Sequence, residues 1–77
     1  MTYERTRQIE LRFRRAATLI EQRTINARQL ANALDVSQPT AHRIVAELRR
    51  RGYQIRAVRE RQGWRYELQG RPNEEIG

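Results

Sequence analysis

Two helix-start signals lie close together in the middle of this chain, and they constrain its fold more than any other feature. Asn26 can cap the free amides of one helix, and Gln29, three residues on, can complete a capping box. Ser37 can cap a second helix, with Pro39 in its first turn, where a missing amide hydrogen costs little. Between these signals, Asp35 tolerates the left-handed backbone that a sharp turn requires. This part of the chain therefore predicts two short helices joined by a tight turn.

Apolar spacing predicts a longer helix before this pair and gives every helix a face to bury. In residues 5–22 the apolar side chains recur at intervals typical of one helical face, at Ile9, Phe13, Ala16, Ala17 and Ile20. Thr24-Ile25 is a β-branched pair that predicts a short extended segment. The two later helices have apolar residues at Leu30, Ala31 and Leu34 and at Ala41, Ile44, Val45 and Leu48. Gly52, which follows a run of arginines, marks the end of the last helix, because cations and a positive-φ glycine both suit a helix C-terminus.

Alternating polar and apolar residues after Gly52 predict a β-hairpin. Strands are expected at residues 54–59 and 64–68, with a glycine-bearing loop at 60–63 between them. The predicted cross-strand pairs are Arg59–Trp64, Ala57–Tyr66, Ile55–Leu68 and, on the solvent side, the opposite charges of Arg56 and Glu67. The core side of the hairpin is then expected to carry Ile55, Ala57, Tyr66 and Leu68.

Together these elements predict the α+β class, with helices followed by a two-stranded hairpin. One domain is expected over residues 1–69 and a flexible tail over residues 70–77, where apolar residues are scarce. The absence of cysteine and the single histidine exclude disulfides and multi-histidine or thiolate metal sites, so no metal or cofactor is expected. No apolar run approaches the roughly 20 residues of a membrane-spanning helix, and we expect a cytoplasmic, nucleoid-associated protein with no membrane partner.

The positive charge is unevenly distributed along the chain. The formal net charge is +7, all sixteen basic residues are arginine, and residues 36–66 hold eight of these arginines against only Glu47 and Glu60. Such a concentration of charge attracts a polyanion and steers its approach, although an excess of arginine that serves solubility alone remains the alternative. No acid/base constellation, nucleophile motif or phosphate-binding glycine loop is present, so we expect neither enzyme activity nor a small-molecule site.

The helix that begins after Ser37 has one face suited to reading DNA. At 100° per residue, the side opposite its apolar seam carries His42, Arg43 and Arg50, with Gln38 near the helix start. Arginine can fork onto guanine and glutamine can pair with adenine. The candidate DNA-binding residues of this helix and of the hairpin are Ser37, Gln38, Pro39, Thr40, His42, Arg43, Arg50, Arg59, Arg61 and Arg65.

Several of these candidates have a second interpretation. Arg43 is expected to contact a base or a phosphate, or else to pair with Glu47 four residues on. The hairpin arginines are expected to reach phosphates or a minor groove, or to form a solvated charge cluster. Ser37 is a helix cap first and a phosphate ligand second. Trp64 is interpreted as a cover for the hairpin or core rather than as a stacking platform.

At this point the sequence resembles a known family, the winged helix–turn–helix domain of DeoR-type regulators, and especially the N-terminal domains of WYL-domain transcription factors. The similarity runs from Leu11 to Leu68, and the segments that carry it are Ala27-Arg28-Gln29-Leu30-Ala31, Leu34-Asp35-Val36-Ser37, Thr40-Ala41-His42-Arg43-Ile44, residues 48–55 and Gly63-Trp64-Arg65-Tyr66-Glu67-Leu68. The resemblance implies that helix 38–51 is the recognition helix and that hairpin 55–68 is the wing. Asp35 stands where the family usually has glycine, and Gln38-Pro39 replaces a more usual basic or hydroxyl pair. No sensing or dimerisation domain follows in this sequence, and we expect the chain to be either a self-contained small regulator or a domain excised from a longer protein.

These observations predict a sequence-specific, double-stranded DNA-binding transcriptional regulator, more specifically a repressor, that forms a homodimer if paired half-sites are read. One alternative is an architectural protein that bends DNA or assists excision or recombination. The other is a protein-interaction module built on the same fold, since winged helices also bind proteins and RNA.

Overall fold

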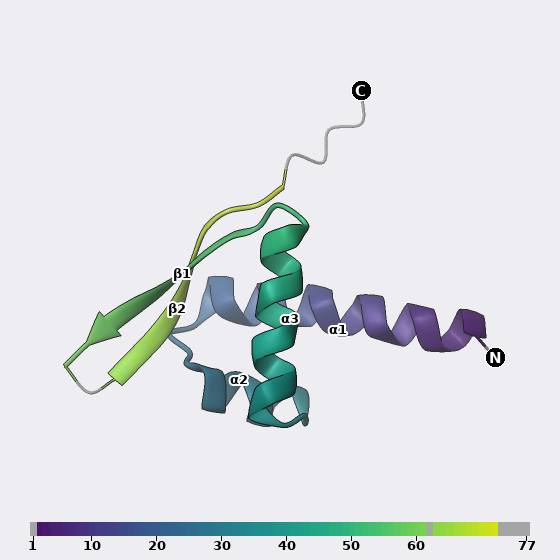
Figure 1. Cartoon of the computed structure of the whole chain (residues 1–77), viewed down its shortest axis with the longest axis horizontal. Helices are drawn as coiled ribbons and strands as arrows, with labels where there is room; N and C mark the ends of the chain where they lie inside the picture. The colour runs from purple at the N-terminus through teal and green to yellow at the C-terminus, as the bar shows by residue number, and fades with distance from the viewer. Residues whose placement is uncertain (1, 62, 73–77) are drawn as a thin grey trace.

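Helices occupy the first two-thirds of the chain and a β-hairpin follows them (Figure 1). The structure is a computed structural model that describes residues 2–61 and 63–72. Within these residues the elements are α1 (Thr2–Gln22), α2 (Ala27–Leu34), α3 (Gln38–Arg50), β1 (Gln54–Glu60) and β2 (Gly63–Gly70). The long α1 runs behind α3, which crosses it, and the hairpin lies to one side of both (Figure 1). This order confirms the predicted α+β class and its helix–helix–helix–hairpin architecture.

The predicted boundaries need small corrections. The last helix ends at Arg50, and Arg51 is its C-cap, so the interval 38–51 was one residue too long. The hairpin is longer than residues 55–68, because its strands begin at Gln54 and end at Gly70. Gly70 therefore belongs to β2 and not to the predicted tail. Residues 73–77 of that tail lie outside the described residues.

Local hydrogen bonds confirm the signals that set α2 and α3. The Asn26 side chain accepts from the Gln29 amide at 2.8 Å, and the Gln29 side chain accepts from the Asn26 amide at 2.9 Å. Asp35 takes the left-handed conformation with φ of 59°, which ends α2 abruptly. The Ser37 hydroxyl then accepts from the Thr40 amide at 3.3 Å and starts α3. Since an N-cap of this kind stabilises a helix by about 1 kcal/mol, the turn between α2 and α3 is fixed by its own sequence.

One hydrophobic core joins the helices to the base of the hairpin. Its buried residues are Ala16, Ala17, Ile20, Ile25, Leu30, Ala31, Leu34, Ala41, Ile44, Val45, Leu48, Ile55 and Tyr66. The expected core positions of α2 and α3 are thus all confirmed. Ile9 is a correction, because its side chain is 44% exposed. The N-terminal half of α1 extends past α3, so Ile9 has too little of the body to pack against (Figure 1).

The hairpin adopts the predicted register. All four expected cross-strand pairs are present, from Arg59–Trp64 at the tip to Ile55–Leu68 at the base. The expected extended segment is also confirmed, because the Tyr66 amide donates to the Ile25 carbonyl at 2.8 Å and fixes β2 beside the α1–α2 connection. Ala57 is a correction, since it is exposed although it shares a face with buried Ile55.

Arg51 fastens the end of α3 to α1. Its guanidinium binds the Glu10 carboxylate at 3.0 Å and the Glu47 carboxylate at 3.2 Å. The same group lies 4.3 Å from the centre of the Phe13 ring, a cation–π geometry. These contacts join residues far apart in sequence and hold α1 across the C-terminal end of α3.

This clamp predicts a pH-dependent contribution to stability. The hydrogen bond from Arg51 lowers the pKa of the Glu10 carboxyl below its ordinary value of 4.5. The folded state therefore keeps Glu10 ionised at a pH where the unfolded chain takes up a proton. Its contribution is fully present above pH 4.5 and is lost as the pH falls through the lower folded-state pKa. We expect the parent chain to have a higher Tm than Glu10→Gln at neutral pH, with the difference shrinking on acidification. Thermal unfolding of both chains across the acid range checks this, and a constant difference in Tm would contradict it.

Candidate nucleic-acid interface

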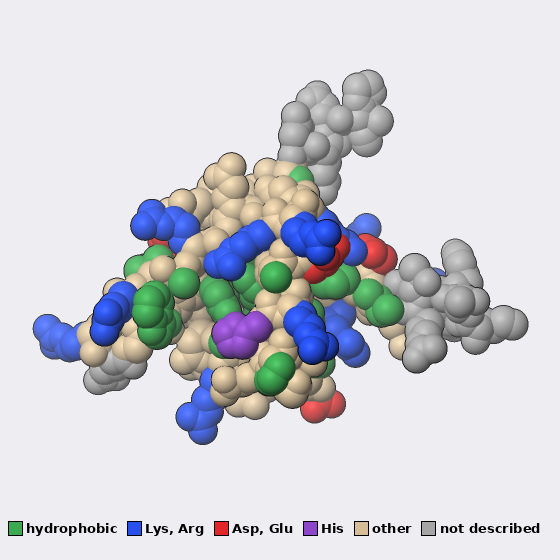
Figure 2. Space-filling view, in the orientation of Figure 1, with side chains coloured by type: hydrophobic (Ala, Val, Ile, Leu, Met, Phe, Trp, Pro, Cys, Tyr) green, Lys and Arg blue, Asp and Glu red, His purple; other side chains and the backbone are tan. Residues whose placement is uncertain are grey.

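Helix α3 turns its apolar seam inward and its cationic side outward. Ala41, Ile44, Val45 and Leu48 are buried. The opposite side of the helix is exposed at Gln38, Pro39, His42, Arg43, Ala46 and Arg50. Figure 2 shows blue arginine side chains over α3 and over the hairpin on this one face, with few red acidic side chains among them. The arc predicted from helical spacing is therefore displayed to solvent and is not sealed against the protein.

The start of α3 presents polar groups beside this arc. The Ser37 hydroxyl donates to the Thr40 hydroxyl at 3.0 Å while it accepts from the Thr40 amide. The Ser37 hydroxyl is thus engaged in capping, as expected, and the Thr40 hydroxyl is its acceptor. Gln38 and Pro39 are exposed on the next positions. Helix N-termini carry a partial positive charge, which favours a phosphate near these groups.

Arg43 is available for an external anion. Its side chain is exposed, and within residues 2–61 and 63–72 it makes no hydrogen bond or ion pair. Glu47, the alternative partner, instead lies 3.2 Å from Arg51 and 4.0 Å from Arg50. Because those arginines already neutralise this carboxylate, the guanidinium fork of Arg43 keeps its capacity for two parallel hydrogen bonds.

The arginines at the end of α3 have different surroundings. Arg49 donates from Nε to the Ile55 carbonyl at 3.0 Å and so ties α3 to β1. Arg51 is held by the clamp to α1. Arg50 has an 81% exposed side chain and only a long contact with Glu47. Of this run, Arg50 is therefore the residue best placed to contact a ligand, which agrees with its selection from the sequence.

The hairpin arginines do not lie together. Side chains alternate between the faces of a strand, so Arg59 shares the inner face with Trp64, whereas Arg65 lies on the outer face. Arg59 lies 5.7 Å from the centre of the Trp64 ring. Arg65 binds the Glu60 carboxylate at 2.6 Å and that of Glu67 at 3.7 Å. Glu67 lies opposite Arg56 as predicted, but it forms its ion pair with Arg65.

The hairpin tip carries one more candidate. Arg61 is exposed at the turn between β1 and β2. The structure thus places Arg59 on the inner face of the hairpin and Arg65 on the outer face, while Arg61 lies at the tip between the strands.

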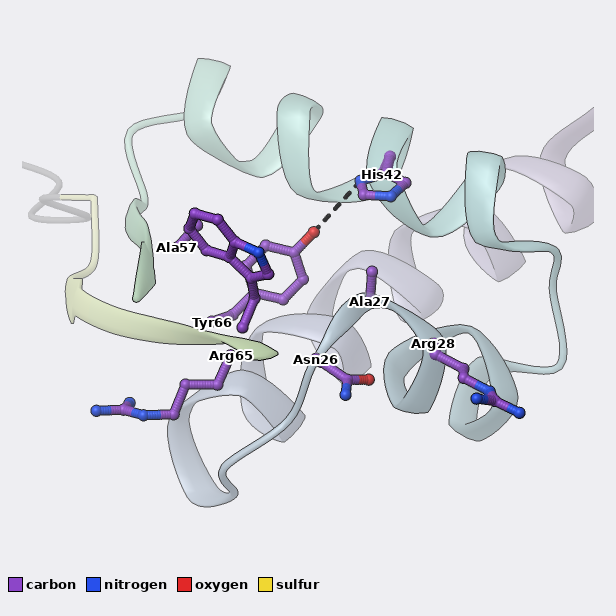
Figure 3. Close-up of a pocket in the computed structure, with 8 residues that line it drawn as sticks. Asn26, Ala27, Arg28, His42, Ala57, Arg65 and Tyr66 are labelled. Carbon is purple, nitrogen blue, oxygen red and sulfur yellow. Dashed lines mark hydrogen bonds between the residues drawn. The ribbon is translucent and has the colours of Figure 1, made fainter. Parts of the chain in front are cut away.

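A hydrogen bond links α3 to the hairpin across the interface. The Tyr66 hydroxyl lies 3.4 Å from Nδ1 of His42, and Figure 3 shows the two side chains pointing toward one another. Burial raises the pKa of the Tyr66 hydroxyl above its ordinary value of 10.0, so the hydroxyl keeps its proton at neutral pH. This contact joins the recognition-helix candidate to the hairpin.

A cavity of about 470 Å³ opens beside this contact, between α3, the start of α2 and the hairpin. Arg28 lines it and is exposed on α2. Arg28 was not among the residues predicted from the sequence to bind DNA, although its position in the first turn of a helix, two residues after the Asn26 cap, is a usual place for an anion contact. No small-molecule site was expected from the sequence, and the residue pattern gave no sign of this concave surface.

Comparison with known proteins supports the fold. Residues 13–65 match a family described as HTH domain, a span that contains α2, α3 and most of the hairpin. No curated protein and no solved structure matches the chain. The narrower assignment to DeoR-type or WYL-domain regulators therefore rests on the sequence resemblance alone. In the part of the chain that the structure describes, no helix has both the length and the apolar character needed to cross a membrane.

Proposed function

The chain belongs to the HTH domain family, and from this premise we propose that it is a sequence-specific regulator of transcription that binds double-stranded DNA. Helix α3 enters the major groove and reads base edges, while the hairpin contacts phosphates or the adjacent minor groove. The proposed contacts are Ser37, Gln38, Pro39, Thr40, His42, Arg43, Arg50, Arg59 and Arg61. Arg65, which faces away from α3, stays a weaker candidate. In this proposal residues 1–69 form the DNA-binding module, and its role is not enzymatic.

The observation that carries the proposal is the exposed guanidinium of Arg43 in the middle of the solvent-facing side of α3, which makes no hydrogen bond or ion pair with any residue that the structure describes. A packed seam on one side and unpaired hydrogen-bond donors on the other are what a helix needs in order to enter a groove. The arginines of the same face supply the charge that attracts the phosphate backbone.

Selection of random duplex fragments by the purified chain tests this function. Sequencing of the retained fragments is expected to return one motif, and competition titration should show that the motif binds at least about a thousandfold more tightly than unrelated DNA. The absence of any enriched motif, together with weak binding of all duplexes at low salt, would contradict the proposal and favour the protein-interaction alternative.

We further propose that binding represses transcription and takes place at the cytoplasmic nucleoid. A domain seated in the major groove of a promoter excludes other proteins from the same bases. A reporter promoter that carries the selected motif is expected to lose activity when the chain is expressed. Increased activity would identify an activator instead.

Pairing of two copies on adjacent half-sites completes the proposal, because one such module reads few base pairs. Leu11 is 52% exposed and Ile9 is 44% exposed on α1, and these side chains are available for a second copy to cover. Sedimentation on DNA with one or two copies of the motif measures the stoichiometry. Binding of a single chain to DNA with two copies of the motif would contradict the proposed pairing of two chains.

The hairpin contacts lead to a prediction that compares two arginines. Arg61→Ala should weaken binding to all DNA sequences alike and reduce the slope of log K against log salt by about one, as expected for one lost phosphate contact. Arg65→Ala removes the same charge, but Arg65 lies on the outer face and is already paired with Glu60 and Glu67. We therefore expect a smaller effect from Arg65→Ala in the same salt titration. A larger effect from Arg65→Ala would mean that the outer face of the hairpin meets the DNA.

A further inference from the structure

The cavity between α3 and the hairpin has walls suited to a flat ring. Aromatic side chains line it from two elements, with Trp64 and Tyr66 on β2 and the imidazole of His42 on α3 (Figure 3). Ala27 and Ala57 also line the cavity, and because their side chains are small they leave its interior open. Its volume of about 470 Å³ falls in the range of pockets that hold small organic ligands. A concave, mostly apolar site with few polar groups is the usual form of such a pocket.

The cavity exists because the hairpin separates from the helices toward its tip. At the base of the inner face, Ile55 and Tyr66 are 6% and 8% exposed. Further along the same face Ala57 is exposed, and the Trp64 side chain is 56% exposed. A tryptophan that covered the core would be buried, so Trp64 does not cover the core, and its packing is against Arg59 of the hairpin.

The charges around the cavity favour an anionic ligand. Arg28 lines the cavity from α2, with its guanidinium extended outward, away from Tyr66 and Ala57 (Figure 3), and Arg59 lies 5.7 Å from the centre of the Trp64 ring. Arg65 also belongs to the lining, although its guanidinium points away toward the acidic residues of the outer face (Figure 3). Among the described residues that line this cavity there is no aspartate or glutamate. An aromatic ring that carries a phosphate combines both features of the site.

We propose that this cavity binds one unpaired nucleotide, with the base stacked on Trp64 and the phosphate at the outer rim of the cavity, on the side of Arg28. If the nucleotide is part of bound DNA, the inference rests on the proposed function. If the nucleotide is a free mononucleotide, the inference is independent of that function. Stacking of one base on an aromatic side chain strengthens binding by about 5- to 150-fold. Extrusion of a paired base from a duplex costs a similar factor, whereas a base that is already unpaired avoids this cost. The site therefore selects duplexes with an unpaired base over fully paired ones, by about tenfold.

Trp64 is the single tryptophan of the sequence, so a difference in tryptophan emission between two bound duplexes reports on the surroundings of this residue. The first probe is a pair of duplexes that carry the selected motif, one fully paired and one with a single-nucleotide bulge at a flanking position. The second probe is free deoxyadenosine monophosphate. We expect the bulged duplex to bind about tenfold more tightly and to quench the emission further. Saturable quenching by the mononucleotide would identify a free nucleotide as a ligand, and quenching by the bulge alone would identify a nucleotide of the bound DNA.

Two substitutions provide matched controls. Ala57→Leu fills the cavity from an exposed position on the inner face, while Val58→Leu adds bulk on the outer face of the same strand. Ala57→Leu should abolish the preference for the bulge, measured with labelled DNA, and Val58→Leu should keep it. Trp64→Leu should likewise remove the preference while binding of the fully paired motif persists.

The outcomes separate this inference from the proposed function. Equal affinity and equal emission with both duplexes, together with no response to the mononucleotide, would overturn the nucleotide site while leaving paired-duplex binding intact. If no duplex binds, the proposed function fails. The titration with the mononucleotide then tests by itself whether the cavity binds a nucleotide. Saturable quenching of the emission supports the site, and unchanged emission overturns it.

Discussion

Leu48→Ala is expected to lower the free energy of unfolding by about 2–5 kcal/mol, the usual cost of deleting a fully buried leucine side chain. Leu48 is 1% exposed in the seam of α3 and is among the largest fully buried side chains of the described residues. A domain of this length has a total stability of about 4–12 kcal/mol. The substitution therefore removes a large share of it, and urea unfolding followed by circular dichroism measures the change.

The matched control is Leu11→Ala on α1, which deletes the same atoms from a side chain that is 52% exposed. We expect this variant to stay within about 0.5 kcal/mol of the parent, since exposed positions away from special features tolerate substitution. Similar losses for both variants would contradict the assignment of the α3 seam to the core. That result would also contradict the assignment of the opposite side of α3 to the DNA. The orientation of the helix about its axis determines at once which residues are buried and which are exposed.

Local sequence signals predicted the part of the fold that holds the interface. The Asn26–Gln29 capping box, the left-handed Asp35 and the Ser37 cap depend on residues within a few positions of one another, and each forms as expected. The hairpin register also follows from local alternation and loop length. Because these interactions need no knowledge of tertiary packing, the relative placement of α2 and α3 and the exposed side of α3 could be read from the sequence.

Tertiary packing determined what the sequence did not predict. Ile9 has the right spacing for a buried face but lies on the half of α1 that extends past the body. Ala57 alternates correctly but lies where the hairpin has left the helices. The cavity and the role of Arg28 as part of its lining depend on that separation. The residue pattern of a single helix or strand does not predict the distance between two elements.

The position of Arg65 is a different case, because the sequence contained the information. The predicted pairing of Arg59 with Trp64 already placed Arg65 on the other face of its strand. Grouping the hairpin arginines by their closeness in sequence overlooked this alternation. The acidic partners on that outer face, Glu60 and Glu67, follow from the same register.

Arg43→Ala is expected to weaken binding to the selected DNA motif by about 1–3 kcal/mol and to relax the preference at one base pair. Arg43 is exposed on the DNA-facing side of α3 and makes no internal ion pair in the part of the chain that the structure describes. Its loss should therefore affect binding without affecting folding. Competition titrations against single-base-pair variants of the motif measure both the affinity and the position at which preference is lost.

Arg43→Lys and Arg12→Ala make this prediction specific to the guanidinium fork. Lysine keeps the charge but cannot form two parallel hydrogen bonds, so Arg43→Lys should retain the salt dependence and still lose discrimination at that base pair. Arg12 is exposed on α1, beside Asp35 and the end of α2, and Arg12→Ala removes one positive charge there. It should leave the base preference unchanged. If Arg43→Ala binds every variant of the motif as the parent chain does, α3 does not read bases through Arg43. If Arg43→Lys keeps full discrimination, its contribution is charge alone and the contact is with a phosphate.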